Sequence, residues 1–241
     1  MPNIADFTLK DMVDFSSALR QMGSGAASME EVADKIVHYL YENLVDKKTG
    51  EKSCVLVRLF KTHPYGELDE DLEEFARNIL KTSPGSPAMK CLILLASAGT
   101  QPEWNSRKQS RGHKAIPLPS EHFVRAFPMI SQMIQQMGLE ITTILQPDPA
   151  VVMDMTQKTY NVFHIPDATG NKYIPAQDDF VIPFGVRSVI GFGGILPSGN
   201  FFVIIMFSKV PIPRQTADMF RSLALSVKVA ILPFVGKTLF T

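Results

Sequence analysis

Two apolar stretches separated by a short turn form the clearest pattern in the sequence. They lie within residues 179–209, and the Pro-Ser-Gly-Asn segment at 197–200 contains residues that favour a tight turn between strands. The second stretch, residues 201–207, is apolar almost without interruption, which predicts a central strand buried on both faces. Apolar residues then recur at helical spacing, so we predict a closing helix over residues 214–232.

The N-terminal half is predicted to contain both helices and strands. The helices are expected at residues 4–22, 28–44 and 69–80, and the strands at 53–60 and 90–96. Ser28 and Glu31 have the spacing of a capping box, and Asp69 can cap the third helix. The two strands, each of which contains a cysteine, are expected to pair with each other.

A long polar segment, residues 97–119, opens the middle of the chain. A polar insertion of this length more often carries function than arises by accident. Helical spacing resumes after it, with Pro128 as a kink or boundary. We predict a helix at 120–137, a strand at 139–145, a short helix that continues to Met155, a strand at 160–165 and a loop at 166–175.

The composition is that of an ordinary soluble protein, and we expect a cytoplasmic location. The 24 Lys and Arg residues balance the 24 Asp and Glu residues, so no overall charge attracts nucleic acid or an anionic membrane. No apolar run is long enough to span a membrane, and the first residues lack the apolar core of a signal peptide. The cysteines, Cys54 and Cys91, have apolar neighbours, which predicts buried and unreactive thiols.

Three segments resemble the GAF family of domains. They are KCLILLASAG at residues 90–99, SRGHKAIPLPS at 110–120 and VRSVIGFGGILPSGNFFVIIMFSK at 186–209. The order of the predicted elements also resembles this family. The resemblance implies an α+β fold, in which a GAF-like antiparallel β-sheet has helices packed on one face and a ligand pocket on the other.

The resemblance also implies a domain organisation and a role. It divides the chain into an N-terminal helical extension, residues 1–27, and a GAF-like sensory domain, residues 28–241, that ends in a long C-terminal helix. Such domains act as regulatory inputs of bacterial signalling proteins, upstream of histidine kinases, cyclases or phosphatases. The implied partner is therefore a downstream signalling output domain or protein.

Two known specialisations of the family are missing from this sequence. A chromophore-attaching Cys beside a His is not present, and neither is the Asn-Lys-Phe-Asp-Glu signature of members that bind cyclic nucleotides. The cofactor, if any, therefore stays unknown. The glycine-rich segment at residues 191–194 leads into another strand rather than a helix, so we interpret it as a bulge or a close backbone approach and not as a phosphate loop.

The residues predicted to bind a ligand come from the polar segment and from the region between residues 164 and 187. An arginine can bind a carboxylate or a phosphate, a tryptophan offers a stacking face, and a neutral histidine can contact a ligand or a haem iron. The predicted ligand-binding residues are Trp104, Asn105, Arg107, Arg111, His113, His164, Tyr173 and Arg187. The alternatives are a solvated loop that Trp104 anchors by packing and, for His164, a purely structural role.

We expect a non-catalytic sensory or regulatory domain, because the sequence has no nucleophile elbow, no lysine-bearing phosphate loop and no zinc-binding spacing of histidines. A small ligand would act allosterically through the terminal helices of a homodimer. One alternative is a small cytoplasmic enzyme on a GAF-like fold, of the thiol-redox or cofactor-dependent kind. Another is a domain that binds no ligand and acts as a dimer spacer. The sequence leaves the ligand and the downstream output open.

Overall fold

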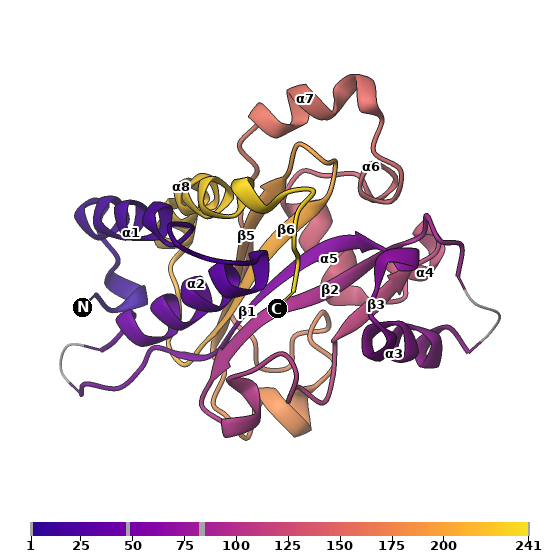
Figure 1. Cartoon of the computed structure of the whole chain (residues 1–241). Coiled ribbons are helices and arrows are strands. Elements are labelled where there is room, and N and C mark those ends of the chain that lie inside the picture. The colour runs from indigo at the N-terminus through magenta and orange to yellow at the C-terminus, as the bar shows by residue number, and fades with distance from the viewer. Residues whose placement is uncertain (1, 47–48, 82–84, 241) are drawn as a thin grey trace.

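An antiparallel sheet is the central element of the fold (Figure 1). The structure is a computed structural model that describes residues 2–46, 49–81 and 85–240. In these residues the sheet has six strands in the order β3-β2-β1-β6-β5-β4, and each neighbouring pair is antiparallel. The strands are β1 (Cys54–Pro64), β2 (Lys90–Gly99), β3 (Ala115–Leu118), β4 (Phe163–Ile165), β5 (Ser188–Ile195) and β6 (Phe201–Ser208). The predicted pairing of the first two strands is confirmed.

Helices cover both faces of the sheet. One face carries α1 (Leu9–Gln21), α2 (Met29–Asn43), α3 (Glu70–Leu80) and α8 (Arg214–Ile231), whose buried residues form one apolar cluster with the sheet. The other face carries α4 (Glu121–Arg125), α5 (Pro128–Gln136), α6 (Ile141–Leu145) and α7 (Pro149–Gln157), which contribute to a second cluster. Figure 1 shows α1, α2 and α8 in front of the sheet and α5 behind it.

The predicted central strand is confirmed as β6, which lies between β1 and β5. Its side chains alternate between the two clusters. Phe202, Ile204 and Met206 belong to the cluster with α8, and Phe201, Val203 and Ile205 belong to the other. This strand therefore joins both halves of the core, because successive side chains of a strand point to opposite faces.

Several predicted helix boundaries are also confirmed. The Ser28 hydroxyl accepts a hydrogen bond from the Glu31 amide, and the Asp69 carboxylate accepts one from the Leu72 amide, so both residues are helix N-caps. Pro128 separates α4 from α5. The closing helix packs along α1, and just before α1 the ring of Phe7 lies 4.8 Å from that of Phe220. The boundary between residues 27 and 28, which the sequence predicts to divide an extension from the domain, stays a prediction.

The predicted strand at 139–145 is wrong, because Ile141–Leu145 forms the helix α6. Its buried residues, Ile141 and Ile144, are three positions apart, which is the spacing of one helix face and not of one strand face. The long polar segment is also shorter than predicted. Its first part continues β2 to Gly99, and its last part is the edge strand β3, where Pro117 is tolerated.

The beginning of the predicted hairpin differs as well. The segment Gln177–Val181 forms a π-helical turn, and β5 begins only at Ser188. The strand predicted at 160–165 is limited to β4, and the strand predicted at 53–60 continues to Pro64. The ring of Phe180 in this turn contacts that of Phe207 in β6, with the centroids 4.9 Å apart. π-helical turns are frequent at functional sites.

The glycines of β5 permit a close backbone approach to β6, as the sequence predicts. A Cβ atom added at Gly193 would lie 2.0 Å from the carbonyl oxygen of Phe202, which is a clash with the neighbouring backbone. At Gly194 the nearest atom would be a side-chain carbon of Tyr160 at 3.5 Å, which is an ordinary contact. Only the first of these two adjacent glycines is therefore required by the packing of the sheet.

We predict that Gly193→Ala lowers the free energy of unfolding by about 3 kcal/mol, because the backbone of β6 must move to admit the methyl group. The matched control is Gly194→Ala, which should change it by less than about 1 kcal/mol. Urea denaturation followed by circular dichroism measures both values. Equal stability of the two variants would contradict the close approach of β5 and β6.

Candidate functional site

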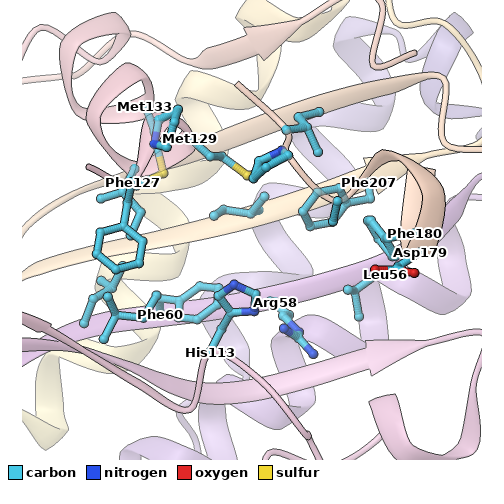
Figure 2. A pocket seen from close by; sticks show the side chains of 18 of the residues that line it. Leu56, Arg58, Phe60, His113, Phe127, Met129, Met133, Asp179, Phe180 and Phe207 are labelled. Carbon is cyan, nitrogen blue, oxygen red and sulfur yellow. The ribbon is translucent and has the colours of Figure 1, made fainter. Parts of the chain in front are cut away.

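A cavity of about 370 Å³ lies on the face of the sheet that carries α5. Its walls come from β1, β2, β3 and β6, from α5, from the π-helical turn and from the loop between β2 and β3 (Figure 2). Most of the side chains that line it are apolar. They include Leu56, Phe60, Leu92, Ile116, Phe127, Met129, Ile130, Met133, Ile174, Phe180, Ile205 and Phe207. The cavity is thus suited to a small molecule with an apolar body.

Arg58 brings a positive charge into this apolar environment. It lies in the middle of β1 and is 9% exposed. Its Nε donates to the Ser97 hydroxyl at 3.3 Å, and its Nη2 donates to the Ser110 hydroxyl at 2.9 Å. No carboxylate of the described residues lies within ion-pair distance of the guanidinium. Burial lowers the pKa of Arg58 to about 10, because a charged group is disfavoured away from water.

Among the described residues, His113 and Asp179 are the other ionisable groups that line this cavity. In Figure 2 the side chain of His113 lies next to that of Arg58. His113 is exposed to solvent on one side, and desolvation by its neighbours first, and then the charge of Arg58, lower the pKa of its imidazole. Its backbone has a φ of 61°, which is uncommon for a residue other than glycine and is frequent at binding sites. Asp179 is exposed and lies on the π-helical turn.

Trp104 packs into an aromatic cluster at the cavity. Its ring centroid is 4.7 Å from that of Phe184 and 5.6 Å from that of Phe180, and Phe180 in turn contacts Phe207 at 4.9 Å. Trp104 also lines the cavity. The sequence left two roles open for Trp104, a contact with a ligand and an anchor for its loop. The structure is compatible with both, because the ring packs against its neighbours and also lines the cavity.

The remaining predicted residues of the loop lie away from the cavity. The Asn105 side chain accepts a hydrogen bond from the Gly99 amide and donates one to the Gln101 carbonyl, so it shapes the loop. Arg107 forms an ion pair with Glu30 of α2, and its guanidinium lies 3.9 Å from the centroid of the Phe240 ring. Arg111 is exposed. A contact of these three residues with a ligand stays a prediction.

The other three predicted residues are also separate from the cavity lining. His164 is buried on the α8 side of the sheet, where its Nε2 donates to the Ile212 carbonyl at 2.9 Å. Tyr173 is half-buried with the Lys172 amine 5.1 Å from its ring centroid, and its neighbour Ile174 lines the cavity instead. Arg187 is exposed. Their ligand-binding role likewise stays a prediction.

Sequence reasoning missed Arg58, although the sequence contains a signal for it. The strand that includes it reads Ser-Cys-Val-Leu-Val-Arg-Leu-Phe, with a single charged residue between apolar neighbours. An arginine at such a position is buried with its strand, and a buried charge requires partners or a special role. The interruption of an apolar strand by one arginine is therefore more informative than the basic residues of the exposed loop.

In the described residues, no group of three or more His, Cys, Asp or Glu side chains is placed to hold a metal ion. No helix within the described ranges is long and apolar enough to cross a membrane.

Comparisons with known proteins identify the fold. No family model matches the sequence, and no curated protein is significantly similar to it. Among solved structures, a free methionine-R-sulfoxide reductase from Neisseria meningitidis, in complex with its substrate, matches with a TM-score of 0.50 and 10% identity, over 94% of this chain and 92% of that chain. The GAF domain of an Acinetobacter phosphoenolpyruvate-protein phosphotransferase matches with a TM-score of 0.47 and 14% identity, over 95% and 97% of the two chains.

At these identities the likeness concerns the fold and does not extend to a ligand or an activity. The antiparallel sheet with helices packed on it is the α+β architecture that the resemblance implies. The protein therefore has a GAF-type fold.

Proposed function

We propose that this protein is a non-catalytic sensory domain that binds a small molecule with an apolar body and a carboxylate group. The observation that supports this proposal is Arg58, a buried guanidinium inside an apolar cavity with two serine hydroxyls as its recorded hydrogen-bond acceptors. A buried charge without a counter-ion is costly, and a bound carboxylate would compensate for that cost by accepting its remaining hydrogen bonds.

The dimensions of the cavity restrict the size of such a ligand. Its volume of about 370 Å³ is near the lower end of the range for small-molecule sites. The apolar body would pack against the methionines of α5 and the aromatic cluster around Trp104, while the carboxylate contacts Arg58. A single aromatic ring or a short branched chain with one acidic group meets these requirements.

The loop between β2 and β3 offers a route for transmission. Trp104 and His113 of this loop line the cavity, and Arg107 of the same loop contacts both α2 and Phe240, which follows α8. A ligand that favours one arrangement of the loop would therefore also bias the segment after α8. In this proposal that segment and the terminal helices carry the signal to an output domain or protein.

The terminal helices also have the apolar surface that a homodimer requires. Their inner faces pack on each other within one chain, but their outer faces leave large side chains in water. Leu9 and Val13 of α1 are 68% and 56% exposed, and Leu225 and Val229 of α8 are 58% and 43% exposed. In both helices the two residues are four positions apart, so they lie on one helix face. We propose this surface as the dimer interface.

The cysteines do not support the alternative of a thiol-redox enzyme. Cys54 and Cys91 are both buried, and burial raises the pKa of each thiol to about 12. They are also far from each other along the paired strands, since Cys91 is opposite His63 of β1 while Cys54 is opposite Ser208 of β6. Neither lines the cavity around Arg58.

The first test compares carboxylates with their neutral amides. We expect small aromatic and branched aliphatic carboxylates to change the fluorescence of Trp104, the single tryptophan of the chain, and the matched primary amides to have little effect. A carboxylate at 100 times its Kd should raise the free energy of unfolding by about 2.7 kcal/mol. Equal binding of acid and amide would contradict the role of Arg58.

The variant Arg58→Met separates binding from folding. We expect it to weaken carboxylate binding roughly tenfold to a hundredfold, because a charged hydrogen bond is lost. The free energy of unfolding should stay unchanged or rise by up to roughly 2 kcal/mol, since an apolar side chain replaces a buried charge. The control Arg77→Met removes an exposed arginine of α3, on the other face of the sheet, and should affect neither quantity. Full binding by Arg58→Met would refute the proposed site.

The second test concerns the homodimer. We expect the protein to sediment as a dimer at micromolar concentration, and Val13→Lys or Leu225→Lys to convert it to a monomer, because each places a charge in an apolar interface. The control is Asn78→Lys, which adds the same charge at an exposed position of α3. Analytical ultracentrifugation distinguishes the two states. A monomeric wild-type protein, or variants that stay dimeric, would contradict this interface.

The third test concerns thiol reactivity. In the folded protein at pH 8 we expect neither cysteine to react with a chromogenic thiol reagent within minutes, because the thiols are buried and their pKa of about 12 leaves very little thiolate. Denatured protein should release the signal of two thiols. Rapid labelling of the native state, assigned with Cys54→Ser and Cys91→Ser, would favour thiol chemistry.

A further inference from the structure

A second cavity lies on the opposite face of the sheet and has a different chemical character. Its volume is about 470 Å³, and it is lined by the end of β1, the start of β2, the turn between β5 and β6, and the segment that follows α8. In Figure 1 this yellow segment descends from α8 to the region of α2, β1 and β2. The charged side chains that line the cavity are Lys61, Glu67, Lys90 and Lys237.

Lys61 is the most buried of these groups, with 4% exposure. Its amine donates to the Thr62 carbonyl at 3.0 Å and lies 3.3 Å from Nδ1 of His63. No carboxylate in the described part of the chain lies within ion-pair distance of it. Burial first, and then the charge of Lys90, lower the pKa of Lys61 to about 8, while Glu67 acts in the opposite direction. The amine is therefore a buried cation at pH 7.

The neighbouring groups do not neutralise this cation. The Lys90 amine donates to the side-chain oxygen of Asn200 at 3.0 Å, which is an uncharged partner. Glu67 lies 3.5 Å from Nε2 of His63 and is mostly exposed. Desolvation, followed by the charge of Lys61, lowers the pKa of His63 to about 4, so this histidine is neutral at pH 7. In the part of the chain that the structure describes, three ammonium groups and one carboxylate thus line this cavity.

We propose that this second cavity binds the phosphate group of a small phosphorylated molecule, with Lys61, Lys90 and Lys237 as its cationic ligands. Lysines bind phosphate as point charges and can approach it from several directions, as these three would from β1, β2 and the segment after α8. The cavity is much larger than a phosphate ion, so it can also admit the group to which the phosphate is attached. This site is independent of the one around Arg58, because the sheet separates them.

Phosphate at this place would also hold the segment after α8 against the sheet. The carbonyls of Thr238 and Leu239 already accept hydrogen bonds from the amides of Met29 and Glu30, at the start of α2. Lys237 is exposed next to these residues, while Lys61 and Lys90 belong to the sheet. An anion between them would replace the repulsion between the ammonium groups with attraction. The segment should therefore become more protected when phosphate binds.

The test uses inorganic phosphate and glycerol phosphate as probes, each compared with potassium chloride at the same ionic strength. Calorimetric titration measures binding, and hydrogen exchange measures the protection of residues 234–239. We expect saturable binding of at least one probe and slower exchange of this segment. Binding of glycerol phosphate but not of inorganic phosphate would indicate a phosphate ester as the ligand, and the reverse would indicate the free ion.

Lys61→Met and the double variant Lys90→Gln/Lys237→Gln should each weaken binding at least tenfold and abolish the added protection. The double variant keeps the test valid if the first variant does not fold, because it changes side chains that are less buried. Lys172→Gln, on the other face, is the control and should bind normally. An effect no larger than that of chloride, or full binding by both variants, would overturn the proposal.

Arg58→Met distinguishes this proposal from the proposed function. It should leave phosphate binding unchanged. If it abolished phosphate binding while the lysine variants kept it, the anion would occupy the cavity around Arg58, and the second site would be refuted without loss of the first. If carboxylates failed to bind while phosphate bound at the lysines, the proposed function would fail and the second site would stand.

Discussion

The burial of β6 on both faces is the constraint on which the rest of the structure depends. A strand with large apolar side chains in both directions, such as Phe202 and Val203, must be covered by two separate layers. The helices α1, α2, α3 and α8 provide one layer, and the helices between β3 and β4 provide the other. Because each layer has its own apolar cluster, the sheet becomes a partition between two distinct environments.

The strand next to β6 carries a charge into each of these environments. Arg58 and Lys61 lie three positions apart in β1, so their side chains point to opposite faces of the sheet. Each lines a cavity and is buried, and neither forms an ion pair with a described carboxylate. A central position in a sheet is rigid, and buried charges on a rigid strand are held in place without side-chain rearrangement. The two cavities are therefore linked through one strand even though the sheet separates them.

The sequence predicts the features that depend on residues close together in the chain. These are the long apolar run of β6, the amphipathic pattern of α8 and the helix caps at Ser28 and Asp69. The helix α6 could not be predicted, because Thr142 and Thr143 favour strands and its burial is decided by tertiary packing. The edge strand β3 was not predicted, because it contains Pro117 and a proline within a short segment argues against a strand.

The site was less predictable than the fold. Trp104 and His113 line the cavity as one loop brings them there, but Arg107 of the same loop turns towards α2. Which residues of a loop face inwards depends on contacts with segments far away in sequence, here Glu30 and Phe240. The sequence shows Arg58 as a single charged residue in an apolar strand. Its role, however, depends on whether a cavity lies on the face of the sheet to which its side chain points, which the sequence does not show.

The contact of Arg107 with Glu30 and Phe240 has a consequence for the energetics of recognition. It fixes the outer side of a cavity wall before any molecule enters, and the side chains of the pair are only 9% and 15% exposed, so dissolved salt screens the contact weakly. An incoming molecule then loses its own freedom of motion but does not have to order the wall. A ligand that changes the arrangement of the loop, as proposed above, would therefore have to work against this ion pair.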